Sequence, residues 1–309
     1  MQRAISLTDR RSAEHRPGAV PASDLRAPRI RTVVLVALLS LSLGGCSVVR
    51  TAYNQLDWVI TRYLTKHFEL DDAQERELRT MVDRNLEWHR TTQLPLYSDF
   101  LANLVATMDE EVTPEQMGAA YNRTLVFWDD FMLQIVPDSQ TFLANLSDEQ
   151  VDQMIERLEK NNEEMYETYS GRTPEQREAR RNKNTIKLAE RVMGRLNDEQ
   201  KDKIRESLAE MEDSSEDWVD NRRQWQVVFI ELVREEPPEA EYRERLASLF
   251  VAPRDYDDPE FQAVIDRNLQ RGLELTAWIV NSMTPQQRRK LNKRLLGFAE
   301  DFDRLAEQT

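Results

Sequence analysis

Six stretches of this chain carry the same signal for the start of an α-helix. In each, a Ser, Thr, Asp or Asn is followed three residues later by Gln, with Pro or Asp directly after the first residue. The first side chain can cap the amide of the third helical residue, while the Gln side chain returns to the cap amide; this is a capping box. The six boxes are Asp71–Gln74, Thr113–Gln116, Ser147–Gln150, Thr173–Gln176, Asn197–Gln200 and Thr284–Gln287.

The boxes could also be copies of one recognition motif. Their first residues are separated by 42, 34, 26, 24 and 87 positions, which is too irregular for a solenoid of equal repeats. We therefore interpret them as well-capped helix starts, each contributing about 1 kcal/mol.

Between the boxes, apolar residues recur every three or four positions, as in Val151, Met154, Ile155 and Leu158. Apolar and polar residues never alternate over a useful length, and glycine is scarce. The sequence predicts an all-α protein, either one elongated helical bundle or two packed sub-bundles with a boundary between 170 and 240. The expected helices span 48–68, 71–92, 95–110, 113–135, 147–169, 173–195, 197–234, 240–250, 258–281 and 284–306.

The amino-terminal region has the order of a secretory signal. Arg29 and Arg31 precede the apolar run 33–43, and Leu43, Gly44 and Gly45 lead into Cys46, the only cysteine. Small residues before a cysteine are typical of a lipoprotein cleavage site, whose thiol receives a diacylglyceryl group. We expect residues 1–45 to be removed, leaving a mature chain from 46 to 309 that begins at an acylated Cys46.

An uncleaved anchor is the alternative, since 32–49 contains no charge over 18 residues. The serines, glycines and cysteine at its end fit a cleaved signal better. Residues 1–28 form an unusually long leader, which suggests a true start further downstream. Ser47 replaces the aspartate that retains enterobacterial lipoproteins in the inner membrane, so we expect the outer membrane, facing the periplasm.

Charge constrains the partners of the mature chain. Residues 1–45 contain seven arginines and three acidic residues, so their removal takes the net charge from −14 to −18. Such a surface repels nucleic acid and, on average, anionic head groups. With its only cysteine acylated, the chain would have no disulfide.

The sequence contains little that could support catalysis. The mature chain has two histidines, His67 and His89, and neither has the spacing to a second ligand that a helical metal site needs. We expect no metal, no cofactor and no enzymatic activity. Glu206-Ser207 is similar to the catalytic dipeptide of lytic transglycosylases, but the glycine-rich stretch that should follow is missing.

One predicted helix carries a basic face formed by Arg180, Lys187, Arg191 and Arg195. Two interpretations remain open. The cations pair with acidic neighbours such as Glu159 in the same bundle, or they dock an acidic partner or lipid phosphates. Aromatic residues cluster at 127–131 and 218–229; core packing is expected, and exposed members could bind apolar client segments or lipid tails.

Several landmarks together resemble a proteobacterial lipoprotein family whose shared domain has no assigned function. They are Tyr53-Asn54-Gln55-Leu56-Asp57-Trp58, Tyr63-Leu64, Leu70–Gln74, Trp88-His89-Arg90 and Leu94–Tyr97. The resemblance implies a helical envelope lipoprotein and supplies no active site. The boxes after Leu146, Leu196 and Met283 are also similar to the Leu-Thr-x-x-Gln motif of the Spy and CpxP periplasmic chaperones, which are shorter proteins with two such motifs.

These observations favour a non-enzymatic outer-membrane lipoprotein that acts through protein–protein contacts in the periplasm, as an accessory subunit of an envelope complex or as an envelope-maintenance factor. Its partner would be an envelope protein. The alternatives are an ATP-independent chaperone for unfolded envelope proteins and, less favoured, a peptidoglycan-cleaving lipoprotein.

Overall fold

The computed structural model describes residues 47–170 and 172–308, and all regular secondary structure in these ranges is helical. This confirms the all-α prediction. Cys46, Leu43, Gly44 and Gly45 lie outside the described residues. The elements are α2 (Ser47–Tyr53), α3 (Leu56–Phe68), α4 (Asp72–Trp88), the π-helical turn η1 (His89–Gln93), α5 (Leu94–Thr107), α6 (Pro114–Ala144), α7 (Asp148–Ser170), α8 (Pro174–Met193), α9 (Asp198–Ala209), α10 (Ser215–Glu235), α11 (Glu239–Val251), the 3₁₀ turn η2 (Pro253–Tyr256), α12 (Pro259–Asn281) and α13 (Pro285–Ala306).

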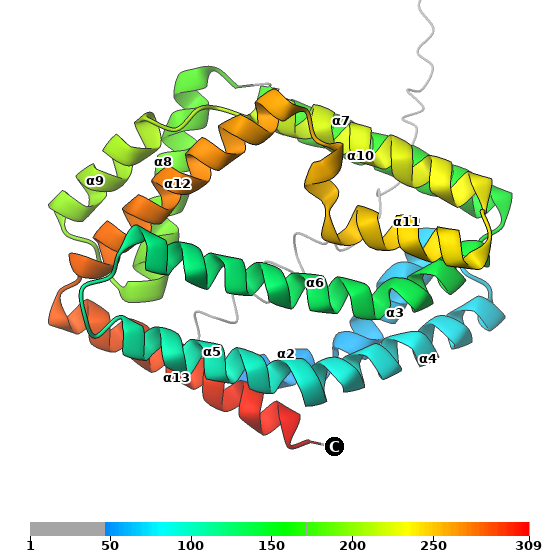
Figure 1. The fold of residues 1–309 in the computed structure, drawn as a ribbon, viewed down its shortest axis with the longest axis horizontal. Helices are drawn as coiled ribbons and strands as arrows, with labels where there is room; N and C mark the ends of the chain where they lie inside the picture. The colour runs from blue at the N-terminus through cyan, green and yellow to red at the C-terminus, as the bar shows by residue number, and fades with distance from the viewer. Residues whose placement is uncertain (1–46, 171, 309) are drawn as a thin grey trace, which may run out of the picture.

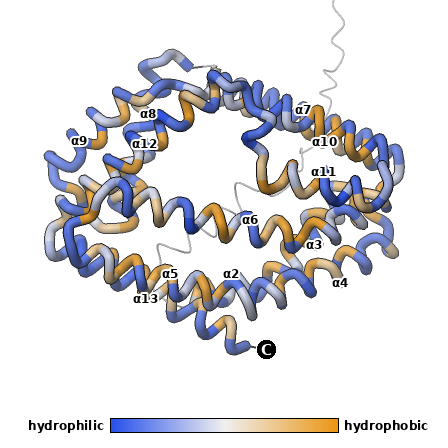
Figure 2. Tube along the Cα trace, viewed as in Figure 1, coloured by the Kyte–Doolittle hydropathy of each residue, from blue (hydrophilic) through white to orange (hydrophobic). Residues whose placement is uncertain are grey.

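The helices pack as an elongated frame, with α6 running along its length (Figure 1). At one end α6 contacts α12, and at the other it contacts α11. Helix α13 lies along α5 and also contacts α8 and α2. Hydrophobic and hydrophilic residues are interspersed along every helix, as expected for helices with one buried face (Figure 2).

Two clusters of buried apolar side chains lie in the two ends of the frame. We call them the α8–α13 end and the α7–α11 end. The first is built from α8, α9, α12 and α13 with the start of α6, and includes Ile204 and Leu196. The second is built from α7, α10 and α11 with the end of α6, and includes Leu232 and Leu246. Because α6 enters both clusters, neither end is a continuous segment of the chain.

The six predicted capping boxes are all present. In five of them the cap side chain accepts from the third helical amide while Gln accepts from the cap amide. In the sixth, Ser147 N–H donates to Gln150 Oε1 at 2.9 Å and Gln150 N–H donates to Ser147 Oγ at 3.3 Å. Local sequence therefore determines where these helices begin.

Four boxes are also joined in two pairs, which the sequence did not indicate. Gln74 and Gln150 each donate a side-chain N–H to the other's oxygen, at 3.0 and 2.9 Å. Their second N–H bonds reach Asn145 O and Glu69 O, which lie two residues before the partner's cap. In this interlocked pair both amide groups have all their hydrogen bonds satisfied.

The second interlocked pair repeats this arrangement at the α8–α13 end. Gln200 donates to Gln287 at 3.1 Å, and Gln287 donates to Gln200 at 2.9 Å. The remaining N–H bonds reach Ser282 O at 3.1 Å and Arg195 O at 2.8 Å, again two residues before each cap. Helix starts far apart in the sequence are thereby held together by four side-chain hydrogen bonds.

Two predicted helices are in fact broken. The helix expected over 48–68 ends at Tyr53 and restarts at Leu56, where Tyr53 and Asn54 bond to His89 and Gln308. The helix expected over 197–234 is interrupted between Ala209 and Ser215. There Asn268 of α12 bonds both the N–H and the carbonyl of Glu212, so tertiary contacts replace helical ones.

At two places where the sequence predicted a break, the chain instead remains helical. The helices expected over 71–92 and 95–110 join through η1, because a wide turn accommodates Pro95. Helix α6 passes through Pro137 and ends at Ala144 rather than at 135. Buried Val136 and Leu143 on either side anchor this helix in the α7–α11 core, which offsets the hydrogen bond that proline removes.

Candidate binding groove

The π-helical turn η1 positions one edge of the candidate site. Pro95 has no N–H, and its ring would clash with the carbonyl four residues earlier in a regular helix. The turn widens instead, and the N–H of Leu94 bonds to the carbonyl of His89, five residues back. Thr92 Oγ1 donates to Trp88 O at 2.7 Å within this turn. Single π turns of this kind occur frequently at functional sites.

Two helices present aromatic stripes to one another beside this turn. On α5, Tyr97, Phe100 and Leu101 lie at helical spacing on one face. On α6, Thr124, Phe127, Trp128 and Phe131 occupy positions i, i+3, i+4 and i+7, and α13 adds Phe302. Together with His89, these side chains line a groove of about 370 Å³, which we call the aromatic groove.

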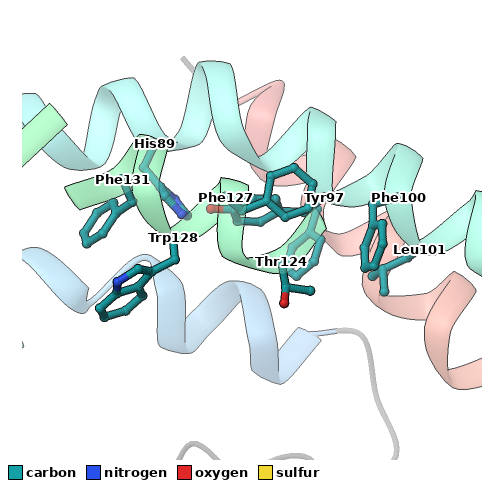
Figure 3. A pocket seen from close by; sticks show the side chains of 9 residues that line it. His89, Tyr97, Phe100, Leu101, Thr124, Phe127, Trp128 and Phe131 are labelled. Atoms are coloured by element: carbon teal, nitrogen blue, oxygen red, sulfur yellow. The ribbon is translucent and has the colours of Figure 1, made fainter. Parts of the chain in front are cut away.

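Phe127 forms the floor of the aromatic groove. Its ring centroid lies 4.7 Å from that of Tyr97 and 5.6 Å from that of Phe100, and the side chain is buried. Trp128, by contrast, is 52% exposed. Figure 3 shows His89 and Phe131 at one end of the groove and Phe100 and Leu101 at the other. The groove therefore presents apolar rings in tilted and edge-to-face contact, with Trp128 open to solvent.

His89 is the only imidazole among the groove's lining residues. Burial lowers its pKa to about 4, so the ring is neutral at pH 7. Its Nδ1 shares a 2.8 Å hydrogen bond with the hydroxyl of Tyr53, whose pKa burial raises to about 12. Tyr97 and Phe131 contact the same ring edge to face. A neutral, half-buried imidazole can offer one hydrogen bond to a bound group.

The groove has the chemistry of a binding site. Its lining residues contain no carboxylate, lysine, arginine or cysteine, so they provide no charged nucleophile. Within residues 47–170 and 172–308, no cluster of three or more His, Cys, Asp or Glu side chains is arranged to hold a metal ion. Large aromatic surfaces with few polar groups suit apolar side chains or hydrocarbon.

A smaller hollow lies at the α7–α11 end. It has a volume of about 240 Å³ and is lined by Trp218, Trp225 and Phe261 together with Arg222 and Arg254. Trp225 stacks on Phe229 at 5.3 Å and donates to Leu249 O, so most of this predicted aromatic cluster packs within the protein.

Three members of the predicted basic face lie on α8, but Arg195 does not, because α8 ends at Met193 and the chain turns at Gly194, whose φ is 98°. The four members, Arg180, Lys187, Arg191 and Arg195, are all exposed. None of the four side chains forms an ion pair with another described residue. The expected acidic neighbour Glu159 pairs with Arg223 of α10 at 2.9 Å instead. Pairing within the bundle therefore does not account for this face.

Glu206, the one candidate for peptidoglycan cleavage, lies on α9. Its carboxylate is mostly exposed and pairs with Lys203 at 3.0 Å. It lines neither of the two pockets described above. Glu206 therefore lies on a solvent-exposed helix face, in keeping with the charged sequence around it.

Sequence reasoning identified the 127–131 cluster but missed its partners. The spacing of Tyr97, Phe100 and Leu101 is a helical stripe that could have been noted. Nothing in the sequence indicates that this stripe faces α6, or that Phe302, about two hundred residues further on, joins it.

The protein is an all-α helical bundle whose described part carries a groove lined by aromatic side chains. Comparison with protein-family models matches residues 66–262 to a family of unknown function, DUF6279, and the chain belongs to this family. The matched range includes η1, α5, α6 and the Gln74–Gln150 pair, but not Gln287 or Phe302. No curated protein and no solved structure matches the chain.

None of the helices in the described part of the chain is both long enough and apolar enough to span a membrane.

Proposed function

We propose that this protein is a non-enzymatic outer-membrane lipoprotein whose aromatic groove holds an apolar segment of an envelope protein partner. The observation that carries the proposal is the groove itself, with Phe127 as its floor and a half-exposed Trp128 at its rim. Aromatic anchors contribute most of the binding energy at many protein interfaces. The net charge of −14 disfavours nucleic acid as a partner.

The lipoprotein part of the proposal is supported by the sequence around Cys46. Acylation there would hold the helical body at a membrane surface and leave the groove facing the periplasm. Mass spectrometry of the amino terminus from native membranes tests this directly, with Cys46→Ala as the control. An acylated Cys46 as first residue supports the assignment, and an intact segment 1–45 contradicts it.

Site-specific photocrosslinking in the native host tests the groove. A photoreactive phenylalanine analogue at position 128 should give one discrete crosslinked species, because that side chain lies at the rim of the groove. The matched control is position 227 on α10, where Val227 is similarly exposed but outside the groove. Crosslinks of equal pattern at both positions, or none at 128, would contradict a dedicated partner.

A ladder of many crosslinked proteins at 128 would instead favour the chaperone alternative. In that case the purified protein should suppress aggregation of an unfolded client at near-equal ratio, and Trp128→Ala should weaken this effect. Muropeptide release abolished by Glu206→Gln is the outcome that would support an enzyme.

A further inference from the structure

The basic face on α8 continues onto a second helix that sequence analysis did not connect with it. The amino-terminal half of α13 carries Arg289, Lys290 and Lys293, all exposed. The side chain of Lys290 packs against Gly194 at the carboxyl end of α8. A methyl group added at Gly194 would lie only 3.2 Å from Lys290 Cδ. Arg294 donates to the backbone carbonyl of Arg191. The two basic segments therefore meet at one helix crossing.

We define the extended basic face by seven cations: three on α8, one just after its carboxyl end, and three on α13. No carboxylate among the described residues forms an ion pair with any of them, and the acidic Glu190 beside them pairs with Lys201 at 3.3 Å. This local concentration of positive charge stands out in a chain of net charge −14. The seven are Arg180, Lys187, Arg191, Arg195, Arg289, Lys290 and Lys293.

Exposed leucines lie within the same face. Leu188 of α8 is 57% exposed and lies one helical turn from Arg191. Leu296 of α13 is 46% exposed and lies one and two turns from Lys293 and Arg289. Leucine flanked by lysine and arginine on an exposed helix surface is typical of segments that lie on a membrane interface.

We propose that the extended basic face binds the phosphate-bearing head groups of an anionic membrane surface, with Leu188 and Leu296 entering the interfacial layer. The cations supply charge complementarity to phosphate, and the leucines distinguish a lipid surface from a purely acidic protein partner. The extended basic face shares no residue with the aromatic groove, which lies further along α13 at Phe302, so membrane binding by this face does not depend on the groove.

The position of the face relative to the amino terminus agrees with this proposal. Helix α2, which begins at Ser47, packs on α13 through an ion pair between Arg50 and Asp301 at 3.2 Å. Lys290 and Asp301 are separated by roughly 17 Å along the helix, given 1.5 Å per residue. A membrane held near α2 could therefore also contact the extended basic face.

A local fluorescence measurement tests the proposal without depending on the amino-terminal anchor. The full chain carrying Cys46→Ser and Leu188→Cys is labelled with an environment-sensitive dye and mixed with phosphatidylcholine vesicles, with or without phosphatidylglycerol. We expect a blue shift only with phosphatidylglycerol, reduced by high salt. A dye at Val227→Cys, on α10, serves as the positional control and should not respond.

Charge variants complete the test. Replacing Lys187, Arg191, Lys290 and Lys293 by Gln should weaken the apparent affinity for phosphatidylglycerol vesicles by about a hundredfold or more. The reason is that each cation near an anionic surface contributes to the binding free energy. The matched control neutralises four exposed cations elsewhere, Lys66, Arg76, Arg79 and Lys160. No shift at position 188, an equal shift at 227, or equal losses in both charge variants would overturn the proposal.

Discussion

The two ends of the frame contain the same interlocked pair of capping boxes in different surroundings. At the α8–α13 end, Gln200 and Gln287 are 0% and 5% exposed. At the α7–α11 end, Gln150 is buried but Gln74 is partly exposed. The bonds between the glutamines and to the carbonyls before each cap are the same at both ends, so the difference in free energy between the pairs should come mainly from burial. Buried amides that lose a partner cannot turn to water instead.

The isolated boxes at Thr113 and Thr173 provide an internal reference for this comparison. Their glutamines, Gln116 and Gln176, are exposed and make only the bond to their own cap amide. The three kinds of box thus separate the contribution of local capping from that of pairing and of burial.

The largest effect is expected at the most buried pair. Gln200→Ala removes both bonds between the two glutamines and the bond to the Ser282 carbonyl in the core, which should lower the free energy of unfolding by about 3 kcal/mol. Urea unfolding measures this loss. In a double-mutant cycle with Gln287→Ala, the double variant should lose clearly less than the sum of the single losses. Simple additivity would show that the two glutamines act separately.

At the α7–α11 end, the corresponding change should cost less. Gln150→Ala removes both bonds to the Gln74 side chain and the bond to the Glu69 carbonyl. Because Gln74 is partly exposed and can bond to water instead, we expect the free energy of unfolding to fall by about 2 kcal/mol. The measurement is the same urea titration. A loss equal to or greater than that of Gln200→Ala would show that burial does not govern the difference between the ends.

Acid should affect the groove between the ends and not the amide pairs, because glutamine does not titrate. Burial in the folded state lowers the pKa of His89 from 6.5 to about 4. Between these two pH values the unfolded state therefore binds the proton more tightly than the folded state. Stability should therefore fall as the pH falls towards 4. Between pH 7 and pH 5 this single group accounts for a loss of about 2 kcal/mol.

The variant His89→Gln isolates that contribution. Tyr53 and Tyr97, which contact His89, stay protonated throughout this range because burial raises the pKa of both. The free energy of unfolding of the variant should decline less than that of the parent between pH 7 and pH 5, while the carboxylates contribute equally to both. Parallel declines would place the acid sensitivity elsewhere.

The smallest effect is expected at the isolated boxes. Gln116→Ala removes one exposed bond to the Thr113 amide and should cost about 0.5 kcal/mol. Gln176→Ala should behave alike, and both can be followed by thermal unfolding. A loss near that of Gln150→Ala would mean that capping, rather than pairing, dominates in all six boxes.

Sequence alone was sufficient for the class of fold and for the six helix starts that carry capping boxes. Each capping box is a contact between residues three positions apart, so its geometry follows from local chemistry. Breaks that depend on distant residues were not predictable: Asn268 bonds to the backbone of Glu212 between α9 and α10, and α2 ends at Tyr53, whose hydroxyl bonds to His89.

The candidate sites show the same division. Helical spacing identified the stripe containing Phe127 and Trp128 and the cations of α8, because residues three, four and seven apart share a face. It wrongly extended this helix face to Arg195, beyond the end of α8. Only the tertiary structure brought Tyr97 and Phe302 to the aromatic groove and Lys290 to the basic face. The pairing of Gln74 with Gln150 and of Gln200 with Gln287 also depends on tertiary structure. Which helix faces meet is decided by the burial of whole surfaces together, a free energy that no local pattern contains.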